Sequence, residues 1–411
     1  MTLVTDLELP EFDHTDPDMR GEHFHHEMRR AREAGWLARG PFGFMTLDRE
    51  SGEFFLRTRS AIFPGMKIAE IFGVTEGPLY EQMRRNILHV NGADHSRLRG
   101  LVNPALSPRA VERYRPAMRE FLAGLLADAT AGSGSAIVEC DFVEAFARPY
   151  PSQVIATVMG APLQDAPRLH HWSNWIQRQF DATSMASERE LIEQAVAEFY
   201  DYAEALVATR RRSPADDLIS RLIQAEEQGD RLSDVECINL VFNVLVGGVD
   251  TTQAQLAHTI RLLAQHPEQW AALRSDASLA GAAVEEALRY EPITPFTARI
   301  LIEDVEYRDV EFPEGTVVMV SAFTGNRDLE GATPEEAERF DITADRARAR
   351  PLTFGAGVHY CLGANLARAE LQEGVTFLAE HMNDLELAGE PEFEGVSGIY
   401  GLARLPVRFT T

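Results

Sequence analysis

The stretch Phe354-Gly-Ala-Gly-Val-His-Tyr-Cys361-Leu-Gly363 places one cysteine in a glycine-rich turn. Good helix formers follow it, and apolar residues recur at helical spacing from Leu366 to Leu378, which predicts a helix over 364–380. Cys361 is therefore expected at a helix N-terminus. Backbone N–H groups and the positive end of the helix dipole stabilise a thiolate there, and a thiolate is a potential metal ligand.

The glycines around the cysteine distinguish a ligand from an ordinary buried cysteine. Gly355, Gly357 and Gly363 leave no side chain where a flat, bulky group would approach the backbone. A lone cysteine is otherwise most often a small buried hydrophobe. Together with Phe354, the glycines favour the ligand interpretation.

These ten residues resemble the FxxGxHxCxG haem-ligand loop of the cytochrome P450 monooxygenases. The resemblance implies a mainly α fold with small β-sheets, organised as a single cytochrome P450 haem domain over residues 1–411. It implies haem b with the Cys361 thiolate as the iron ligand, and it assigns Phe354, Gly355, His359 and Gly363 to cofactor binding. We expect residues 1–20 to form a loosely ordered N-terminal arm.

Composition restricts the partners and the compartment. The chain has 411 residues, of which 45% are hydrophobic, so it can bury a large core. Its three cysteines are widely spaced, which predicts no disulfide framework and a reducing, cytoplasmic location. Neither a secretion signal nor a membrane span is expected from the sequence. The formal net charge of −25 argues against nucleic acid or an anionic membrane as the main partner.

A basic pair precedes the helical middle of the chain. His95 and Arg99 are four residues apart, so on a helix they face the same way. Two such donors suit a pair of carboxylates, and an ordinary basic helix face is the alternative. The segment is similar to the family's HxxxR helix, which implies that both side chains hold haem propionates. The resemblance implies the same role for Arg299.

The segment 233–265 is predicted to form one long helix. Ser233 and Glu236 make a capping box, and a His-Pro pair at 266–267 supplies the stop. Residues 238–249 are apolar on nearly all sides, which predicts burial. Gly247 and Gly248 in its centre cost a helix about 1 kcal/mol each, so the helix is weakened there.

Polar residues follow the two glycines directly. Asp250 and Thr251 violate the apolar pattern of a core helix, which indicates either function or a bend packed against a neighbour. Gly247 and Gly248 leave room for a planar cofactor and a small ligand, and a broken backbone hydrogen bond leaves room for water. The stretch matches the family's acid–alcohol motif, which implies that Asp250 and Thr251 deliver protons.

Three further residues are expected to support the fold. Glu286 and Arg289 are three positions apart on a predicted helix, a spacing that is weak evidence alone. In the family, this buried pair joins an arginine from a later loop. Arg339 is the matching position here.

Asn243 shares a helix face with Gly247 and Thr251, so we expect it in or near the substrate pocket. Its amide would bond the substrate, a water or a neighbouring helix. The rest of the expected lining is apolar: Phe72, in a predicted irregular loop over 66–80, with Val246, Phe296 and Ile399.

Three histidines, His23, His25 and His26, lie in a predicted helix over 22–34. Only His23 and His26 would share a helical face, and no other ligand accompanies them. We therefore interpret them as part of a solvated face and not as a metal site.

The resemblance implies a haem-thiolate monooxygenase that inserts one oxygen atom from O2 into a small organic substrate. Electrons would come from NAD(P)H through a ferredoxin reductase and a ferredoxin. An acidic ferredoxin would dock on a basic patch, for which the candidates are Arg97, Arg99, Arg109, Arg113, Arg115, Arg119, Arg346, Arg348 and Arg350.

Two other functions stay open at this point. One is a peroxide-driven or non-oxygenating haem-thiolate protein, against which the intact Asp250-Thr251 pair argues. The other is a haem protein that only senses a small ligand or carries electrons, which would need neither proton delivery nor a large pocket.

Overall fold

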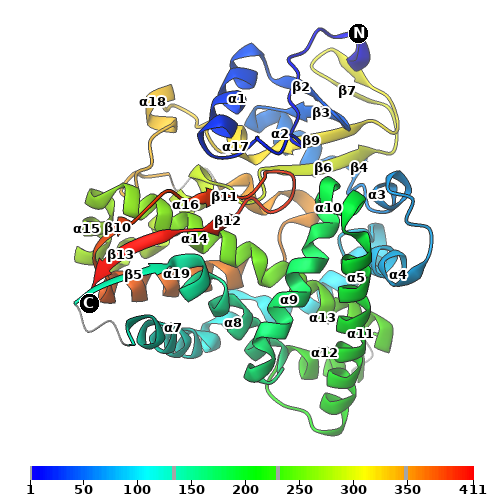
Figure 1. Ribbon diagram of the computed structural model, residues 1–411. Helices are drawn as coiled ribbons and strands as arrows, with labels where there is room; N and C mark the ends of the chain where they lie inside the picture. The colour runs from blue at the N-terminus through cyan, green and yellow to red at the C-terminus, as the bar shows by residue number, and fades with distance from the viewer. Residues whose placement is uncertain (1, 132–135, 228–231, 347–349) are drawn as a thin grey trace.

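A computed structural model describes residues 2–131, 136–227, 232–346 and 350–411. The described chain is mainly α-helical with small β-sheets, as the sequence implies. In Figure 1 a mixed sheet with α1 and α2 lies at one end of the molecule, and the long helices, among them α7, α9, α11, α14 and α19, make up the rest.

The α-helices are α1 Gly21–Ala34, α2 Arg49–Arg57, α3 Met66–Ile71, α4 Gly77–Arg85, α5 Gly92–Val102, α6 Pro108–Val111, α7 Arg115–Thr130, α8 Pro149–Met159, α9 Ala166–Gln177, α10 Ala182–Ser187, α11 Arg189–Arg212, α12 Leu218–Glu227, α13 Asp234–Gly248, α14 Asp250–Gln265, α15 Pro267–Ser275, α16 Ala280–Tyr290, α17 Ala322–Gly325, α18 Pro334–Ala337 and α19 Ala364–His381. The strands are β1 Thr2–Leu3, β2 Leu37–Gly40, β3 Gly43–Thr46, β4 Ala61–Ile62, β5 Ile137–Asp141, β6 Phe296–Leu301, β7 Val305–Tyr307, β8 Val310–Phe312, β9 Val317–Ser321, β10 Asn383–Leu387, β11 Glu392–Phe393, β12 Leu402–Arg404 and β13 Pro406–Thr410.

The largest sheet of the described residues has the strand order β2-β3-β9-β6-β4. β3 and β9 are parallel, and the other neighbours in this sheet are antiparallel. Arg299 of β6 is opposite Val318 of β9, so the sheet fixes the backbone of a predicted site residue. The smaller sheets are β1-β8-β7, β10-β13-β5 and β11-β12.

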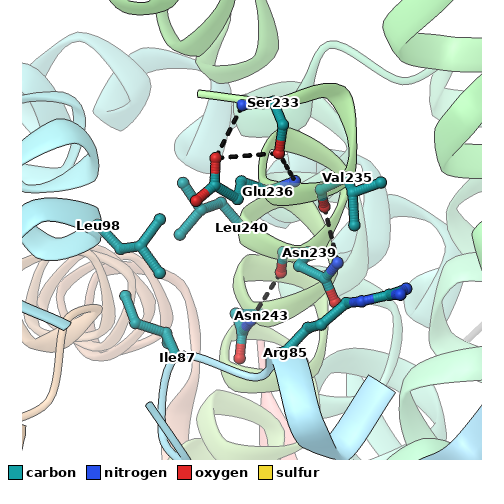
Figure 2. Close-up of a pocket in the computed structure, with 9 residues that line it drawn as sticks. All are labelled: Arg85, Ile87, Leu98, Ser233, Val235, Glu236, Asn239, Leu240 and Asn243. Carbon is teal, nitrogen blue, oxygen red and sulfur yellow. Dashed lines mark hydrogen bonds between the residues drawn. The ribbon is translucent and has the colours of Figure 1, made fainter. Parts of the chain in front are cut away.

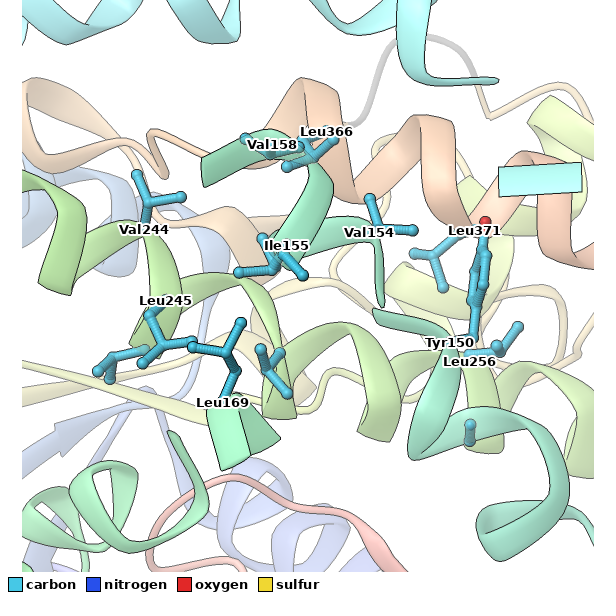
Figure 3. Packing of buried hydrophobic residues seen from close by; sticks show 14 of the residues in the cluster. Tyr150, Val154, Ile155, Val158, Leu169, Val244, Leu245, Leu256, Leu366 and Leu371 are labelled. Atoms are coloured by element: carbon cyan, nitrogen blue, oxygen red, sulfur yellow. The ribbon is translucent and has the colours of Figure 1, made fainter. Parts of the chain in front are cut away.

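The main core lies where α8 packs against the long helices α13, α14 and α19 (Figure 3). Burying each large aliphatic side chain there contributes about 1.5–3 kcal/mol, so this layer holds the central helices in place. The packed side chains are Tyr150, Val154, Ile155 and Val158 of α8, with Val244, Leu245, Leu256, Leu366 and Leu371.

The predicted long helix forms as two consecutive helices. The capping box of Ser233 and Glu236 begins α13, as predicted. The helix is interrupted at Val249, directly after the two glycines, and α14 then continues to Gln265. The segment Asp234–Gln265 is long and apolar enough to cross a membrane, but 61% of its most apolar 18-residue stretch is buried inside the protein. Its apolar character is therefore that of a core helix.

The N-terminal segment differs from expectation. Thr2–Leu3 pairs in parallel with β8, and Val4 and Phe12 are buried. For residues 2–20 the prediction of a loosely ordered arm is wrong, because these apolar side chains pack into the core beside the sheet.

Two local predictions are also corrected. His25 is buried and its Nε2 lies 2.9 Å from Glu291 Oε1, so only His23 and His26 belong to a solvated face. The expected irregular loop over 66–80 contains α3 and the start of α4. Gly73 lies between these helices at a φ of +62°, a conformation that glycine adopts easily. The glycines of this segment therefore mark the break between two short helices and not one irregular loop.

Candidate active site

A cavity of about 470 Å³ lies between the cysteine loop, the α13–α14 junction and β6. It brings together most of the predicted site residues. Those that line it are Phe72, His95, Arg99, Asn243, Val246, Gly247, Gly248, Thr251, Phe296, Arg299, Phe354, Gly355, His359, Cys361, Gly363 and Ile399. Asp250, Glu286, Arg289 and Arg339 are not among the described lining residues.

The cysteine loop is a tight turn that closes just before α19. The Cys361 N–H donates a hydrogen bond to the Phe354 carbonyl oxygen at 2.9 Å. Gly357 has a φ of +72°, and a Cβ there would come within 2.5 Å of the Leu56 carbonyl oxygen. This turn therefore requires glycine at position 357. Gly355 and Gly363 instead border open space, which leaves the cavity free beside the sulfur.

Burial raises the pKa of the Cys361 thiol, because a thiolate loses its hydration there. The backbone N–H groups of Gly363 and Ala364 and the Arg99 and Arg368 guanidinium groups act in the opposite direction. The N-terminus of α19 thus lowers the pKa of Cys361, as predicted, but burial raises this pKa by more. A cation bound at the sulfur would complete the stabilisation of the thiolate.

Four basic side chains gather at one end of the cavity. The His95 and His359 rings are in contact, with 4.3 Å between centroids and their planes tilted by 49°, and Arg99 Nη1 donates to the Tyr360 carbonyl oxygen at 2.8 Å. Burial, with the nearby His95, Arg299 and Arg99, lowers the pKa of His359 to about 3. Burial also lowers the pKa of Arg299 to about 10, and among the described residues its guanidinium donates only to the backbone carbonyl of Ala298.

This end of the cavity has the chemistry of an anion site. Of the described lining residues, Glu370 alone carries a carboxyl, and it belongs to α19. His359 Nδ1 is buried without a hydrogen-bond partner. A buried cation such as the Arg299 guanidinium is normally paired with an acid, so this end of the cavity suits a ligand with acidic groups. The Cys361 thiol lies beside open space in the cavity, and the basic side chains lie at one end of it. This arrangement fits the haem that the sequence implies.

The two central glycines serve different purposes. A Cβ on Gly248 would lie 2.3 Å from Ile155 Cδ1, so Gly248 allows α8 to approach closely. A Cβ on Gly247 would meet nothing within 4 Å, so this position keeps the cavity open. Thr251 Oγ1 donates to the Gly247 carbonyl oxygen at 2.7 Å and lines the cavity.

Asp250 has a different environment from Thr251. Its carboxylate is buried and accepts hydrogen bonds from Ser173 Oγ and, at 3.3 Å, from Asn174 Nδ2 of α9. Burial raises the pKa of Asp250, although Ser173 and His170 oppose the rise. The structure therefore does not bring the predicted acid–alcohol pair together at the cavity.

The buried pair Glu286 and Arg289 forms as predicted, with Arg289 Nε and Nη2 donating to the two carboxylate oxygens at 2.7 and 2.8 Å. The prediction for Arg339 is wrong. Its side chain is 65% exposed and pairs with Asp341, and only its backbone carbonyl accepts from Arg289. Arg346 is the third arginine, with Nε 3.0 Å from Glu286 Oε2. The chain turns at Asp341, which directs Arg339 outward and returns Arg346 to the pair.

Asn243 lines the cavity and also a second pocket of about 230 Å³ beside it (Figure 2). Its Nδ2 donates to the Asn239 carbonyl oxygen at 2.6 Å, and Asn239 Oδ1 accepts from Tyr200. One half of the Asn243 amide is thus satisfied within its own helix. Its other half, the Oδ1 oxygen, is the part that a ligand could contact.

Sequence reasoning missed several polar lining residues. Gln255 and Glu370 line the cavity and are buried, and each has an oxygen without a hydrogen-bond partner. Glu370 follows Leu366 by four residues and so falls in the apolar stripe of α19. A carboxyl in such a stripe is a signal that the sequence does contain.

The family model described as cytochrome P450 matches residues 70–381 of this chain. A luteothin monooxygenase of Streptomyces thioluteus is 34% identical over 406 residues, covering 98% of this chain and 96% of the relative. A mycinamicin IV hydroxylase/epoxidase of Micromonospora griseorubida is 37% identical over 314 residues, or 76% of each chain. The crystal structure of CalO2 superposes with a TM-score of 0.88 at 30% identity, covering 98% of this chain and 99% of that one.

Proposed function

The chain belongs to the cytochrome P450 family and is a monooxygenase, and from this membership we propose that it inserts one oxygen atom from O2 into an organic substrate bound beside Cys361. The family implies a thiolate-ligated haem. When bound, that haem supplies the oxygen-activating chemistry, while the protein positions the substrate and excludes competing reactions. We further propose that the cofactor is haem b and that residues 1–411 form one haem domain.

One observation carries the proposal: a half-buried thiol shares a cavity with a cluster of basic groups, and Glu370 of α19 is the one carboxyl among the described lining residues. Cys361 would ligate the iron. His95, Arg99, Arg299 and His359 would bind the two propionates. Gly247, Gly248, Phe354, Gly355 and Gly363 would form the walls that lie against the flat group.

Proton handling is assigned to the chain's own residues. Thr251 presents a hydroxyl on the cavity wall, and its hydrogen bond to Gly247 holds that hydroxyl at the weakened part of the helix. Asp250 would supply protons to it after leaving Ser173, because its present contacts direct it toward α9. General acid–base groups of this kind contribute about 10²–10⁴-fold to a rate.

The proposed substrate is a bulky, largely apolar natural product with some hydrogen-bonding groups. Relatives named for luteothin and mycinamicin IV support this class. Phe72, Val246, Phe296 and Ile399 would form the apolar lining, and the free half of the Asn243 amide would meet a polar group.

For electrons we propose a ferredoxin and a ferredoxin reductase that use NAD(P)H in the cytoplasm, and we propose neither nucleic acid nor membrane as a partner. The expected basic patch is weaker than the sequence suggests. Arg97, Arg113, Arg115 and Arg119 are paired with acidic side chains, and Arg348 lies outside the described residues. Arg109 and Arg350 are exposed and are the main arginines of the expected patch that remain for docking.

The test of the cofactor is the spectrum of the reduced carbon monoxide complex. We expect the strongly red-shifted Soret band of a thiolate-ligated haem, its loss in Cys361→His, and its retention in Cys140→Ser. A wild-type band typical of histidine ligation would contradict the proposal.

The test of the reaction uses a compound library with substrate-induced spectral shifts as the first readout. Any compound that shifts the spectrum should then be oxidised with consumption of NAD(P)H in the presence of a ferredoxin system. Oxidation with peroxide alone would favour the peroxide-driven alternative, and absence of turnover with every redox partner would favour a ligand sensor.

A further inference from the structure

The amide side chains of the cavity wall show which kind of hydrogen-bonding group the cavity accepts. Those among the described lining residues are Asn86, Gln177, Gln179, Asn243 and Gln255. An amide NH2 group only donates and an amide oxygen only accepts. An amide whose NH2 group is already bonded within the protein therefore offers its oxygen to a ligand.

Gln179 lies in the short turn Arg178–Phe180 that follows α9, and it is 1% exposed. Its Nε2 donates to the Ile176 carbonyl oxygen at 2.9 Å. Its Oε1 is buried and has no hydrogen-bond partner among the described residues. Exchanging the two atoms would place an oxygen against the Ile176 carbonyl oxygen, and neither of these could donate. The contact with Ile176 therefore fixes the oxygen of Gln179 as its free atom.

Two further amides have the same orientation. Asn243 Nδ2 donates to the Asn239 carbonyl oxygen, and Figure 2 shows the Asn243 oxygen on the other side of the amide. Gln255 Nε2 donates to the Glu291 carbonyl oxygen at 3.2 Å, and its Oε1 has no partner among the described residues. Each of these amides uses its donor on a backbone carbonyl and leaves an acceptor for the cavity.

The remaining two amides differ from one another. Gln177, the last residue of α9, has a buried Oε1 that no described residue satisfies. Asn86 is the exception, because its Oδ1 accepts from the Leu88 N–H at 2.9 Å and its NH2 group is left. The described lining residues include no carboxyl on α9 or α13. The acceptors there are neutral, so they suit a neutral donor better than an ammonium group, which needs a counter-charge when it is buried.

We propose that the substrate is a hydroxylated compound whose hydroxyl groups donate hydrogen bonds to the amide oxygens of Gln179 and Asn243, and that Gln179 thereby determines specificity. A buried acceptor left without a donor is costly, so the site disfavours a compound that cannot donate. A ligand hydroxyl replaces the hydrogen bond of a displaced water, whereas an ether or a methyl group does not. Calling the ligand a substrate rests on the proposed monooxygenase function, but the requirement for a donor does not.

Imidazoles with an alkyl chain on one ring nitrogen test this requirement in the haem-loaded protein. Their second nitrogen is a ligand for haem iron, so the chain extends from the iron into the cavity. At each chain length, a terminal hydroxyl donates and accepts, a methoxy group only accepts, and a methyl group does neither. Calorimetry should show the hydroxyl compound binding at least about tenfold tighter than the methoxy compound at one or more chain lengths. Equal or weaker binding of the hydroxyl compound at every length would overturn the proposal.

Replacing both acceptors, with Gln179→Met and Asn243→Leu in one protein, should abolish the preference for the hydroxyl compound. Gln153→Met is the matched control and should retain it. Gln153 of α8 also has a buried oxygen without a described partner, but it is not among the described lining residues of the cavity. A preference that survives in the double variant would overturn the proposal.

The visible spectrum recorded in the same titrations reports whether the imidazole binds iron. Iron ligation without a preference for the hydroxyl compound would overturn the requirement for a donor and leave the proposed function standing. A preference for the hydroxyl compound without iron ligation would support the requirement and contradict the haem site. The two failures are therefore distinguishable.

Discussion

Asp250 and Thr251 are adjacent in the chain, yet their side chains bond to different parts of the protein. The Asp250 carboxylate accepts from Ser173 and Asn174 of α9, whereas the Thr251 hydroxyl donates to Gly247 of α13 and lines the cavity. A direct transfer from one to the other thus requires the first turn of α14 to reorganise. Asp250 is the first residue of α14, and the N–H groups of a first helical turn have no partner within their own helix, so reorganising this turn breaks few backbone hydrogen bonds.

The first prediction concerns this hydroxyl. Thr251→Ala should leave haem binding and the thiolate spectrum intact, but it should lower the rate of product formation by roughly 10²-fold while NAD(P)H is still consumed. Thr251→Ser keeps the hydroxyl and should retain most of the wild-type coupling. Equal product per NAD(P)H in Thr251→Ala and wild type would remove Thr251 from proton delivery.

The second prediction separates two arginines that the sequence does not distinguish. Arg346→Leu removes a partner of the buried Glu286 and should lower the free energy of unfolding by about 3 kcal/mol. Arg339→Leu removes an exposed ion pair and should change it by less than about 1 kcal/mol. Urea unfolding of both variants measures the difference. Equal losses would mean that Arg339 supports the Glu286–Arg289 pair after all.

The sequence predicted those parts of the site that depend on local spacing. The turn at Gly357, the cap at Ser233 and the shared face of His95 and Arg99 are each set within a few residues. By contrast, the choice of Arg346 depends on how the loop around Asp341 returns to α16. Helical periodicity carries no information about that path.

Contacts between distant segments account for the other differences. His25 and Glu291 are 266 positions apart, so periodicity alone assigned His25 to a solvated face. Thr2 and Leu3 pair with β8 across about three hundred residues, which no local pattern announces. The orientation of Asp250 similarly depends on α9, whose Ser173 carries no signal of its own in the sequence.

The third prediction concerns Arg299, whose effect should change sign when haem binds. Its buried guanidinium has no acidic partner among the described residues, and burial lowers its pKa to about 10. Keeping it charged therefore costs the haem-free protein up to about 3 kcal/mol. Arg299→Met should stabilise the haem-free protein by about 1–3 kcal/mol and weaken haem retention at least about tenfold.

Urea unfolding of the haem-free protein and the transfer of haem to apomyoglobin measure these two effects. Arg109→Met, at an exposed position of α6, is the control and should alter neither. An Arg299→Met variant that is destabilised without haem would mean that the guanidinium has a partner within the protein.

The last prediction concerns the acid stability of the contact between α1 and α14. Glu291 is fully buried and accepts from Arg261 Nη2 at 2.6 Å, while His25 Nε2 lies 2.9 Å from its other oxygen. Burial alone would raise the pKa of Glu291, but His25 and Arg261 outweigh it and hold this pKa well below the usual 4.5. The unfolded chain thus takes up the proton first as the pH falls. The stability that Glu291 contributes is complete above pH 4.5 and declines below it.

Glu291→Gln should therefore lower the free energy of unfolding by about 3–5 kcal/mol at neutral pH, because it leaves Arg261 buried without its carboxylate. The gap between wild type and variant should narrow as the pH is lowered, because only the wild type loses this contribution to acid. Exposed Glu306→Gln is the control and should follow the wild type at every pH. Urea unfolding at a series of pH values measures the gap. A gap that stays constant or widens toward acid would show that Glu291 is not held as a carboxylate by His25 and Arg261.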